Sequence, residues 1–293
     1  MLNDNPHIEK PPLPSMPAGV VVRETICKTL LTVSRLGDYS MNCYVGCQHA
    51  CAYCYARFIQ RFKPHEEPWG TFVDVKINAV EALERQLRRA KPGAVFVSSA
   101  CDGWQPLEER FCLTRECCRL LIEKGFTVHA LTKGALILRD LDVLARGPSR
   151  VAVTLTCLDE SLRKIWEPQA TPIQQRIEVL RAARLAGIET GVMLGPLLPF
   201  LTDSQDYVDR LLERVAEEDV DVIWVDALNP RPKVWESLVV VLRRHYPELL
   251  SRYRAVLFSP LVREAYCQAL HERVKRAAER LGIADRVVAC MKQ

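Results

Sequence analysis

The chain has 293 residues, with 48% hydrophobic and 26% charged residues, which is ordinary for a soluble globular protein and sufficient for one large α/β domain or a barrel. Its longest run without Asp, Glu, Lys, Arg or His, 190–202, holds two prolines and is too short to span a bilayer, so we expect no membrane partner. Twelve cysteines without a secretory signal argue against a disulfide framework and predict a cytoplasmic location. The net charge of +4 permits a phosphate-bearing partner without requiring one.

The N-terminal part is expected to lie outside the main fold. Residues 1–17 are polar and rich in proline, which predicts a flexible arm, and residues 20–34 read as an extended lead-in. We therefore assign 1–37 to an N-terminal arm and lead-in. Alternation across 39–45 predicts a strand, and a cysteine-rich loop follows it.

Strands and helices then alternate. After a short helix at 55–62 and a strand at 72–77, Asn78 and Glu81 form a capping-box pattern that predicts a helix through residue 89. Apolar runs predict strands at 94–100, 126–131, 150–156, 188–194 and 220–226, separated by amphipathic helices. This order predicts a parallel sheet with right-handed crossovers and about six βα units, too few for a closed eight-stranded barrel. We expect an open partial (β/α)6 barrel over 38–232 and a helical C-terminal extension over 233–293.

Three cysteines, Cys47, Cys51 and Cys54, lie within eight residues. Thiols at this density are typical of metal or cluster ligands, and three thiolates fit a 4Fe–4S cluster with one iron left without a protein ligand. Two alternatives stay open. One is a zinc or structural site with a further ligand. The other is Cys43 as a fourth cluster ligand, which would leave only electron transfer, although the strand pattern favours Cys43 as a core residue.

The spacing Cys-x3-Cys-x2-Cys resembles that of the radical S-adenosylmethionine (SAM) enzymes. The resemblance implies two cofactors, a 4Fe–4S cluster and SAM. The open iron would chelate the methionine part of SAM, and one electron would cleave SAM to a 5′-deoxyadenosyl radical. It also implies the partial radical SAM barrel and an external one-electron donor of the flavodoxin or ferredoxin type.

Polar residues lie at the ends of successive predicted strands. Asp102 and Lys133 follow two of the strands, and Thr154 lies near the end of the next one. The carboxyl ends of parallel strands share one rim, and the cysteine loop opens on the same rim. We therefore expect Asp102, Lys133 and Thr154 to bind the zwitterionic methionine part of SAM.

Several longer motifs narrow the resemblance to the spore photoproduct lyase branch, often labelled DNA repair photolyase-like. Spread over about 38–230, they are Cys-Gln-His-Ala-Cys-Ala-Tyr-Cys-Tyr-Ala-Arg, Cys-Asp-Gly-Trp-Gln-Pro-Leu-Glu, Leu-Thr-Lys, Leu-Arg-Asp-Leu-Asp, Glu-Pro-Gln-Ala and Pro-Leu-Leu-Pro. The resemblance implies Cys101 as a hydrogen-atom donor, Tyr53 and Tyr55 as a radical relay, and Lys133 and Thr154 as contacts of the methionine carboxylate. The chain departs from the branch in its Cys-Asp-Gly-Trp-Gln-Pro motif, and 235–293 shows no match to the lyase's DNA-binding hairpin.

The sequence therefore predicts a radical SAM enzyme with spore photoproduct lyase-like reversal of a DNA lesion, and hence a nucleic acid substrate. The alternatives are a radical SAM enzyme that acts on RNA, a peptide or a small molecule, and a non-catalytic Fe–S electron carrier.

Overall fold

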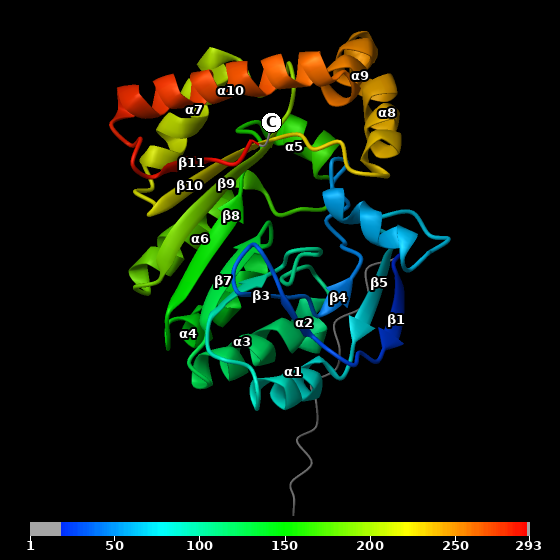
Figure 1. The fold of residues 1–293 in the computed structure, drawn as a ribbon, viewed down its shortest axis with the longest axis vertical. Coiled ribbons are helices and arrows are strands. Elements are labelled where there is room, and N and C mark those ends of the chain that lie inside the picture. Colours follow the sequence, from blue (N-terminus) through cyan, green and yellow to red (C-terminus); the bar gives the residue numbers. More distant parts are fainter. Residues whose placement is uncertain (1–18, 292–293) are drawn as a thin grey trace, which may run out of the picture.

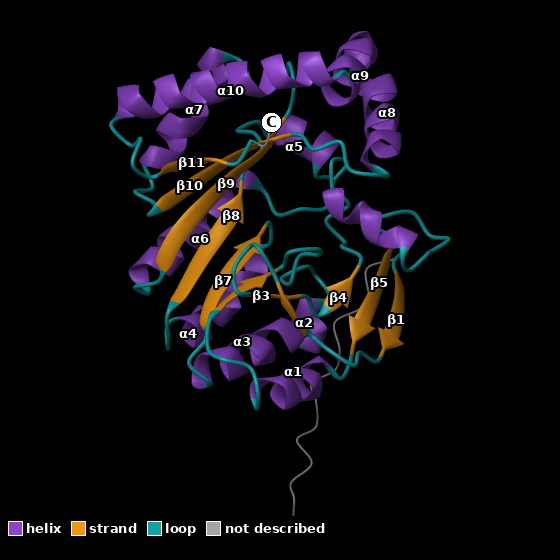
Figure 2. Ribbon diagram, viewed as in Figure 1, coloured by secondary structure: helices purple, strands orange, loops and turns teal. Residues whose placement is uncertain are grey.

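The computed structural model describes residues 19–291, so the predicted flexible arm at 1–17 lies outside the described residues. Two sheets form the fold, one of eight strands in the order β11-β10-β9-β8-β7-β6-β3-β2 and one of three strands in the order β1-β5-β4 (Figure 2). The strands are β1 (Val21–Thr25), β2 (Leu31–Val33), β3 (Tyr39–Met41), β4 (Tyr44–Val45), β5 (Phe72–Lys76), β6 (Ala94–Val97), β7 (Thr127–Thr132), β8 (Ser149–Thr154), β9 (Glu189–Leu197), β10 (Val222–Ala227) and β11 (Val287–Ala289).

Helices follow most of the strands along the chain (Figure 1). They are the 3-10 helices η1 (Tyr55–Arg61), η2 (Ala135–Asp140) and η3 (Pro247–Leu249) and the α-helices α1 (Ala79–Leu87), α2 (Glu108–Phe111), α3 (Leu113–Glu123), α4 (Leu141–Leu144), α5 (Glu160–Trp166), α6 (Ile173–Leu185), α7 (Gln205–Ala216), α8 (Val234–His245), α9 (Leu250–Phe258) and α10 (Pro260–Leu281). Helix α3 packs on β7, and α6 packs on β8 and β9.

The predicted parallel sheet is confirmed. Strands β3, β6, β7, β8, β9 and β10 all pair in parallel, and the order of the sheet runs from β11 to β2 without closing among the described strands. Strands β6 and β7 fully bury every second side chain, as expected when one face of a strand packs more tightly than the other, whereas β8 buries its last four and is covered on both faces there. The result is a mixed α/β fold of parallel strands and covering helices.

Three local features differ from the sequence-based expectation. The lead-in is extended as expected, but it belongs to the sheets, because β1 pairs in parallel with β5 and β2 pairs antiparallel with β3. The C-terminal extension ends in β11, which pairs with β10. Asn78 makes no capping hydrogen bond, because its side chain binds the backbone of Cys27. The division into 1–37, 38–232 and 233–293 stays a prediction.

The C-terminal helices pack against the outer side of the cysteine loop. A second hydrophobic cluster joins Cys51, Ala52 and Tyr53 of the loop to Trp166 and to buried residues of α8 and α9, namely Val234, Leu238, Leu242, Tyr253 and Leu257. Helix α10 lies across α7 and α9 (Figure 1). Within residues 19–291, no helix has the length and apolarity needed to cross a bilayer.

Candidate active site

The cysteine loop leaves β4 through a backbone shape that requires glycine. Gly46 has a φ of +91°, and a Cβ at this position would lie 2.4 Å from the carbonyl oxygen of Phe72. Two hydrogen bonds then close the loop, from the Ala50 amide to the Cys47 carbonyl at 3.3 Å and from the Cys54 amide to the Cys51 carbonyl at 3.3 Å. The three loop thiols are consequently held in one compact turn next to β5.

The loop thiols are free, and Cys47 and Cys51 are largely buried. Burial raises the pKa of the Cys51 thiol to about 12, so a bound cation is needed to make it a thiolate at neutral pH. Within the part of the chain that the structure describes, no three His, Cys, Asp or Glu side chains converge as ligands of a single metal ion. Thiolate sulfurs are the usual protein ligands of iron–sulfur clusters.

Cys43, the alternative fourth ligand, directly precedes β4, whereas the cysteine loop follows β4. Its side chain is 2% exposed, and its Sγ lies 3.8 Å from the Sγ of Cys117 on α3. This contact places the Cys43 thiol among the core residues between sheet and helix, as the strand pattern predicted.

Asp102 fixes the loop from the end of β6. One carboxylate oxygen accepts hydrogen bonds from the Thr132 hydroxyl at 2.6 Å and the Trp104 amide at 2.9 Å. The other accepts from the Lys133 amide at 2.7 Å and lies 3.3 Å from His49 Nδ1 within the cysteine loop. Burial alone would raise the pKa of Asp102, but His49 and these hydrogen bonds lower it to about 2. Both oxygens are therefore engaged within the protein, and a direct contact of Asp102 with SAM stays a prediction.

A buried ionic network contacts the cysteine loop through Tyr53. The Tyr53 hydroxyl donates to Glu167 and lies 3.0 Å from the Thr156 hydroxyl, and Glu167 forms an ion pair with Arg176. Glu167, Thr156 and Arg176 are each 1–2% exposed. Burial would raise the pKa of Glu167, but the charges of Arg176 and Lys133 lower it to about 2. The end of α5 adds a backbone contact, since the Ala52 amide donates to the Trp166 carbonyl at 2.9 Å.

Lys133 and Thr154 lie side by side on the rim, as predicted. Thr132, the last residue of β7, pairs with Val153, so Lys133 and Thr154 end neighbouring strands. The Lys133 ammonium lies 5.6 Å from the centre of the Tyr53 ring, and among the described residues it forms no ion pair. Thr154 is 3% exposed, and its carbonyl accepts from Arg176 at 2.9 Å. A partly buried cation thus faces the cysteine loop.

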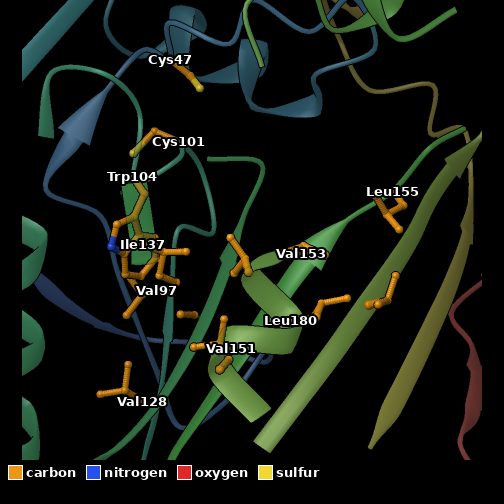
Figure 3. Packing of buried hydrophobic residues seen from close by; sticks show 14 of the residues in the cluster. Cys47, Val97, Cys101, Trp104, Val128, Ile137, Val151, Val153, Leu155 and Leu180 are labelled. Carbon is orange, nitrogen blue, oxygen red and sulfur yellow. The ribbon is translucent and has the colours of Figure 1, made fainter. Parts of the chain in front are cut away.

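Cys101 follows β6 and lies close to the start of the cysteine loop, and Tyr55, the first residue of η1, reaches the same segment after β6. The Cys101 thiol donates to the Tyr44 carbonyl at 3.2 Å, and burial raises its pKa to about 12. The Tyr55 hydroxyl donates to the Ser99 carbonyl. Cys101 and Cys47 occupy the same end of the buried core, above Trp104 and Val97 in Figure 3.

The structure places the predicted site residues in the cysteine loop, at the start of η1 and at or after the ends of β6, β7 and β8, and it adds residues that the sequence did not single out. The roles of the predicted residues stay predictions. The added residues are Glu167, Arg176 and His49. In the sequence, Glu167 stands out only as part of the Glu-Pro-Gln-Ala motif. Nothing else in the sequence near Glu167, which directly follows α5, indicates a buried carboxylate.

A family model of the radical SAM superfamily matches residues 41–215. This chain belongs to the radical SAM superfamily. An uncharacterized protein of Mycobacterium tuberculosis is 33% identical over 271 residues, covering 87% of this chain and 79% of the relative. The radical SAM Nalpha-GlyT isomerase of Pseudomonas phage M6 is 26% identical over 182 residues, covering 61% of this chain and 36% of that protein.

A solved structure shows the same radical SAM fold. It is a mutant of spore photoproduct lyase with bound AdoMet and dinucleoside spore photoproduct, with a TM-score of 0.67 and 13% identity, covering 96% of this chain and 87% of that chain. Radical SAM proteins use SAM and an iron–sulfur cluster, so both cofactors are implied for this chain.

Proposed function

We propose that this protein is an enzyme that cleaves SAM reductively with a 4Fe–4S cluster held by Cys47, Cys51 and Cys54, and that it acts on a lesion in DNA. The observation that carries the proposal is the loop of three free thiols on a rim that also presents the Lys133 ammonium and a protonated thiol, Cys101. When bound, the cluster and SAM supply a carbon radical that abstracts hydrogen from the substrate.

The residues of the rim have separate roles in this proposal. Lys133 and Thr154 hold the carboxylate of SAM, because an ammonium and a hydroxyl are the donors that a carboxylate requires. Asp102 and Glu167 act as positioning residues, since each is tied to the cysteine loop, through His49 and Tyr53 respectively. Tyr53 stays protonated because burial and the charge of Glu167 raise its pKa well above the usual value.

Cys101 is proposed as the donor of a hydrogen atom to the substrate radical. Hydrogen-atom donation needs an intact S–H bond, and a pKa of about 12 keeps this thiol protonated at neutral pH. The Tyr44 carbonyl fixes the thiol in one place. Tyr55, whose hydroxyl donates a hydrogen bond to the Ser99 carbonyl, is the proposed phenol that reduces the resulting thiyl radical.

The proposal of a DNA substrate is supported by the shared fold with spore photoproduct lyase, a protein solved with a dinucleoside lesion. We infer a one-electron donor of the flavodoxin or ferredoxin type, as radical SAM chemistry requires. A substrate other than DNA remains the second candidate.

The test of the proposal has two steps. First, the protein is reconstituted anaerobically with iron and sulfide, and its iron content and 5′-deoxyadenosine formation with SAM and dithionite are measured. Cys51→Ser should lose both iron and product, whereas Cys43→Ser should keep both. If Cys43→Ser lost its iron and the wild type formed no 5′-deoxyadenosine, the protein would be an electron carrier.

The second step concerns Cys101. With lesion-containing DNA and labelled SAM, Cys101→Ala should still form 5′-deoxyadenosine but should change the ratio of repaired product to side products. An unchanged product ratio would remove Cys101 from the mechanism. Turnover of a peptide or RNA but not of DNA would replace the proposed substrate class.

A further inference from the structure

The segment that follows the cysteine loop carries a row of aromatic rings toward solvent. Tyr55 and Phe58 lie three residues apart on the 3-10 helix η1, so they share one face of it, and Phe62 is its C-cap. The rings of Tyr55 and Phe58 are nearly parallel, with centroids 6.5 Å apart, and Phe58 meets Phe62 edge-on at 6.4 Å. We call these three residues the aromatic row. It lies in the blue helical segment between α8 and β5 in Figure 1.

The aromatic row is exposed where a folded protein would normally bury it. Tyr55 is 44% exposed and Phe62 is 80% exposed, while Phe58 is partly buried between them. Large apolar side chains exposed next to one another mark binding surfaces more often than single exposed residues do.

The row begins at the proposed active site. Tyr55 directly follows Cys54, and its hydroxyl donates to the Ser99 carbonyl, two residues before Cys101. A substrate strand whose reacting group lay near Cys101 would therefore pass Tyr55 first and then Phe58 and Phe62.

A cation lies at one end of the row. Arg61 precedes Phe62, it is exposed, and among residues 19–291 it forms no ion pair. Exposed aromatic faces beside such a cation match a strand of nucleotides, whose bases stack and whose phosphates are negative.

We propose that the aromatic row stacks the unpaired bases that flank the reacting nucleotide in single-stranded or locally opened DNA, and that Arg61 holds an adjoining phosphate. The inference rests on the proposed function and adds the path of the substrate strand. An acidic electron-transfer protein is the rival occupant. The row is narrow, however, whereas a stable protein interface covers about 800 Å² on each partner.

The test measures binding of a fluorescein-labelled single-stranded oligothymidylate to the reconstituted enzyme by anisotropy. Phe62→Ala should weaken binding about tenfold, the effect of losing one stacked base. Phe258→Ala is the matched control, since Phe258 is 51% exposed on α9 but packs edge-on against Trp235 at 5.4 Å. It should leave the affinity unchanged. Circular dichroism checks that both variants fold, and iron content checks that both bind the cluster.

Salt dependence tests the cation separately. Arg61→Gln should reduce the slope of log affinity against log salt by about 0.7, the contribution of one single-strand phosphate. Arg89→Gln is the control, because it removes an exposed arginine that lies near β2 and outside the aromatic row, and it should leave the slope unchanged.

The outcomes separate this inference from the proposed function. If the wild type binds the oligonucleotide and Phe62→Ala binds equally well, the aromatic row is not the path of the strand. If Phe62→Ala instead slows reduction by a flavodoxin-type donor, the row is a protein contact, and the inference is overturned. If the wild type forms 5′-deoxyadenosine but binds no DNA, both the inference and the DNA part of the proposed function fail, while the SAM chemistry stands.

Discussion

Replacing Glu167 with Gln should destabilise the apoprotein by about 3 kcal/mol. Glu167 and Arg176 are both 1% exposed and form an ion pair, and Gln leaves the Arg176 charge in the core without its counter-charge. Breaking a buried pair in this way costs about 3–5 kcal/mol. Arg176 keeps its hydrogen bonds to the carbonyls of Thr154 and Thr171, which places the expected cost at the lower end.

The pKa of Glu167 leads to a similar magnitude. It falls from the ordinary value of 4.5 to about 2, and each pKa unit corresponds to about 1.4 kcal/mol, so ionised Glu167 contributes about 3 kcal/mol. Because the pKa in the folded state is the lower one, this contribution is complete above about pH 5 and is lost as the pH falls toward 2.

Urea unfolding of the wild type and of Glu167→Gln, followed by circular dichroism at several pH values between 7 and about 3, measures both effects. The difference in unfolding free energy should be about 3 kcal/mol at pH 7 and should shrink as the solution becomes acidic. The control is Glu189→Gln, which breaks the half-exposed pair with Arg150 and should cost less than about 1 kcal/mol. A Glu167→Gln cost below about 1 kcal/mol, or one independent of pH, would refute the buried-pair argument.

The remaining predictions concern the loop and the rim. Gly46→Ala should destabilise the protein by more than about 2 kcal/mol in urea unfolding, because the new Cβ would lie 2.4 Å from a backbone oxygen. Gly125→Ala also has a positive φ but has no atom within 4 Å, so it should cost only about 1 kcal/mol, and equal costs would contradict the clash. Lys133→Met should weaken SAM binding in equilibrium dialysis at least about tenfold without reducing iron content, and unchanged binding would exclude Lys133 as a contact of SAM. Asp102→Asn should lower stability at pH 7 but not near pH 2, because the pKa of Asp102 is about 2, and a loss that persists in acid would show that its charge is not the cause.

The sequence predicted the parts of the fold that local patterns encode. Apolar runs located the strands of the parallel sheet, and the helices between them followed from their amphipathic spacing. It did not predict that residues 21–25 join a sheet, because β1 pairs with β5 some fifty residues away and its own burial pattern is irregular. Asn78 failed as a cap for the same reason, since its side chain meets the backbone of distant Cys27.

The candidate site likewise contains residues that local sequence patterns identify and residues that they do not. The cysteine spacing and the strand-end positions of Lys133 and Thr154 are local features and could be identified from the sequence. The pairing of Asp102 with His49 depends on which loops meet at the rim, and no local pattern in the sequence encodes such a meeting. Glu167 pairs with Arg176 on α6, only nine residues later, but the pair is recognisable only once both side chains are seen to be buried.

The last described strand has a practical consequence. Strand β11 pairs with β10 in parallel, and the Cys290 amide donates to the Val225 carbonyl at 2.8 Å, so the end of the chain covers the backbone groups of β10. Without β11, the row of polar groups along β10 would be open to strands of other molecules. A chain truncated before residue 287 is therefore expected to aggregate.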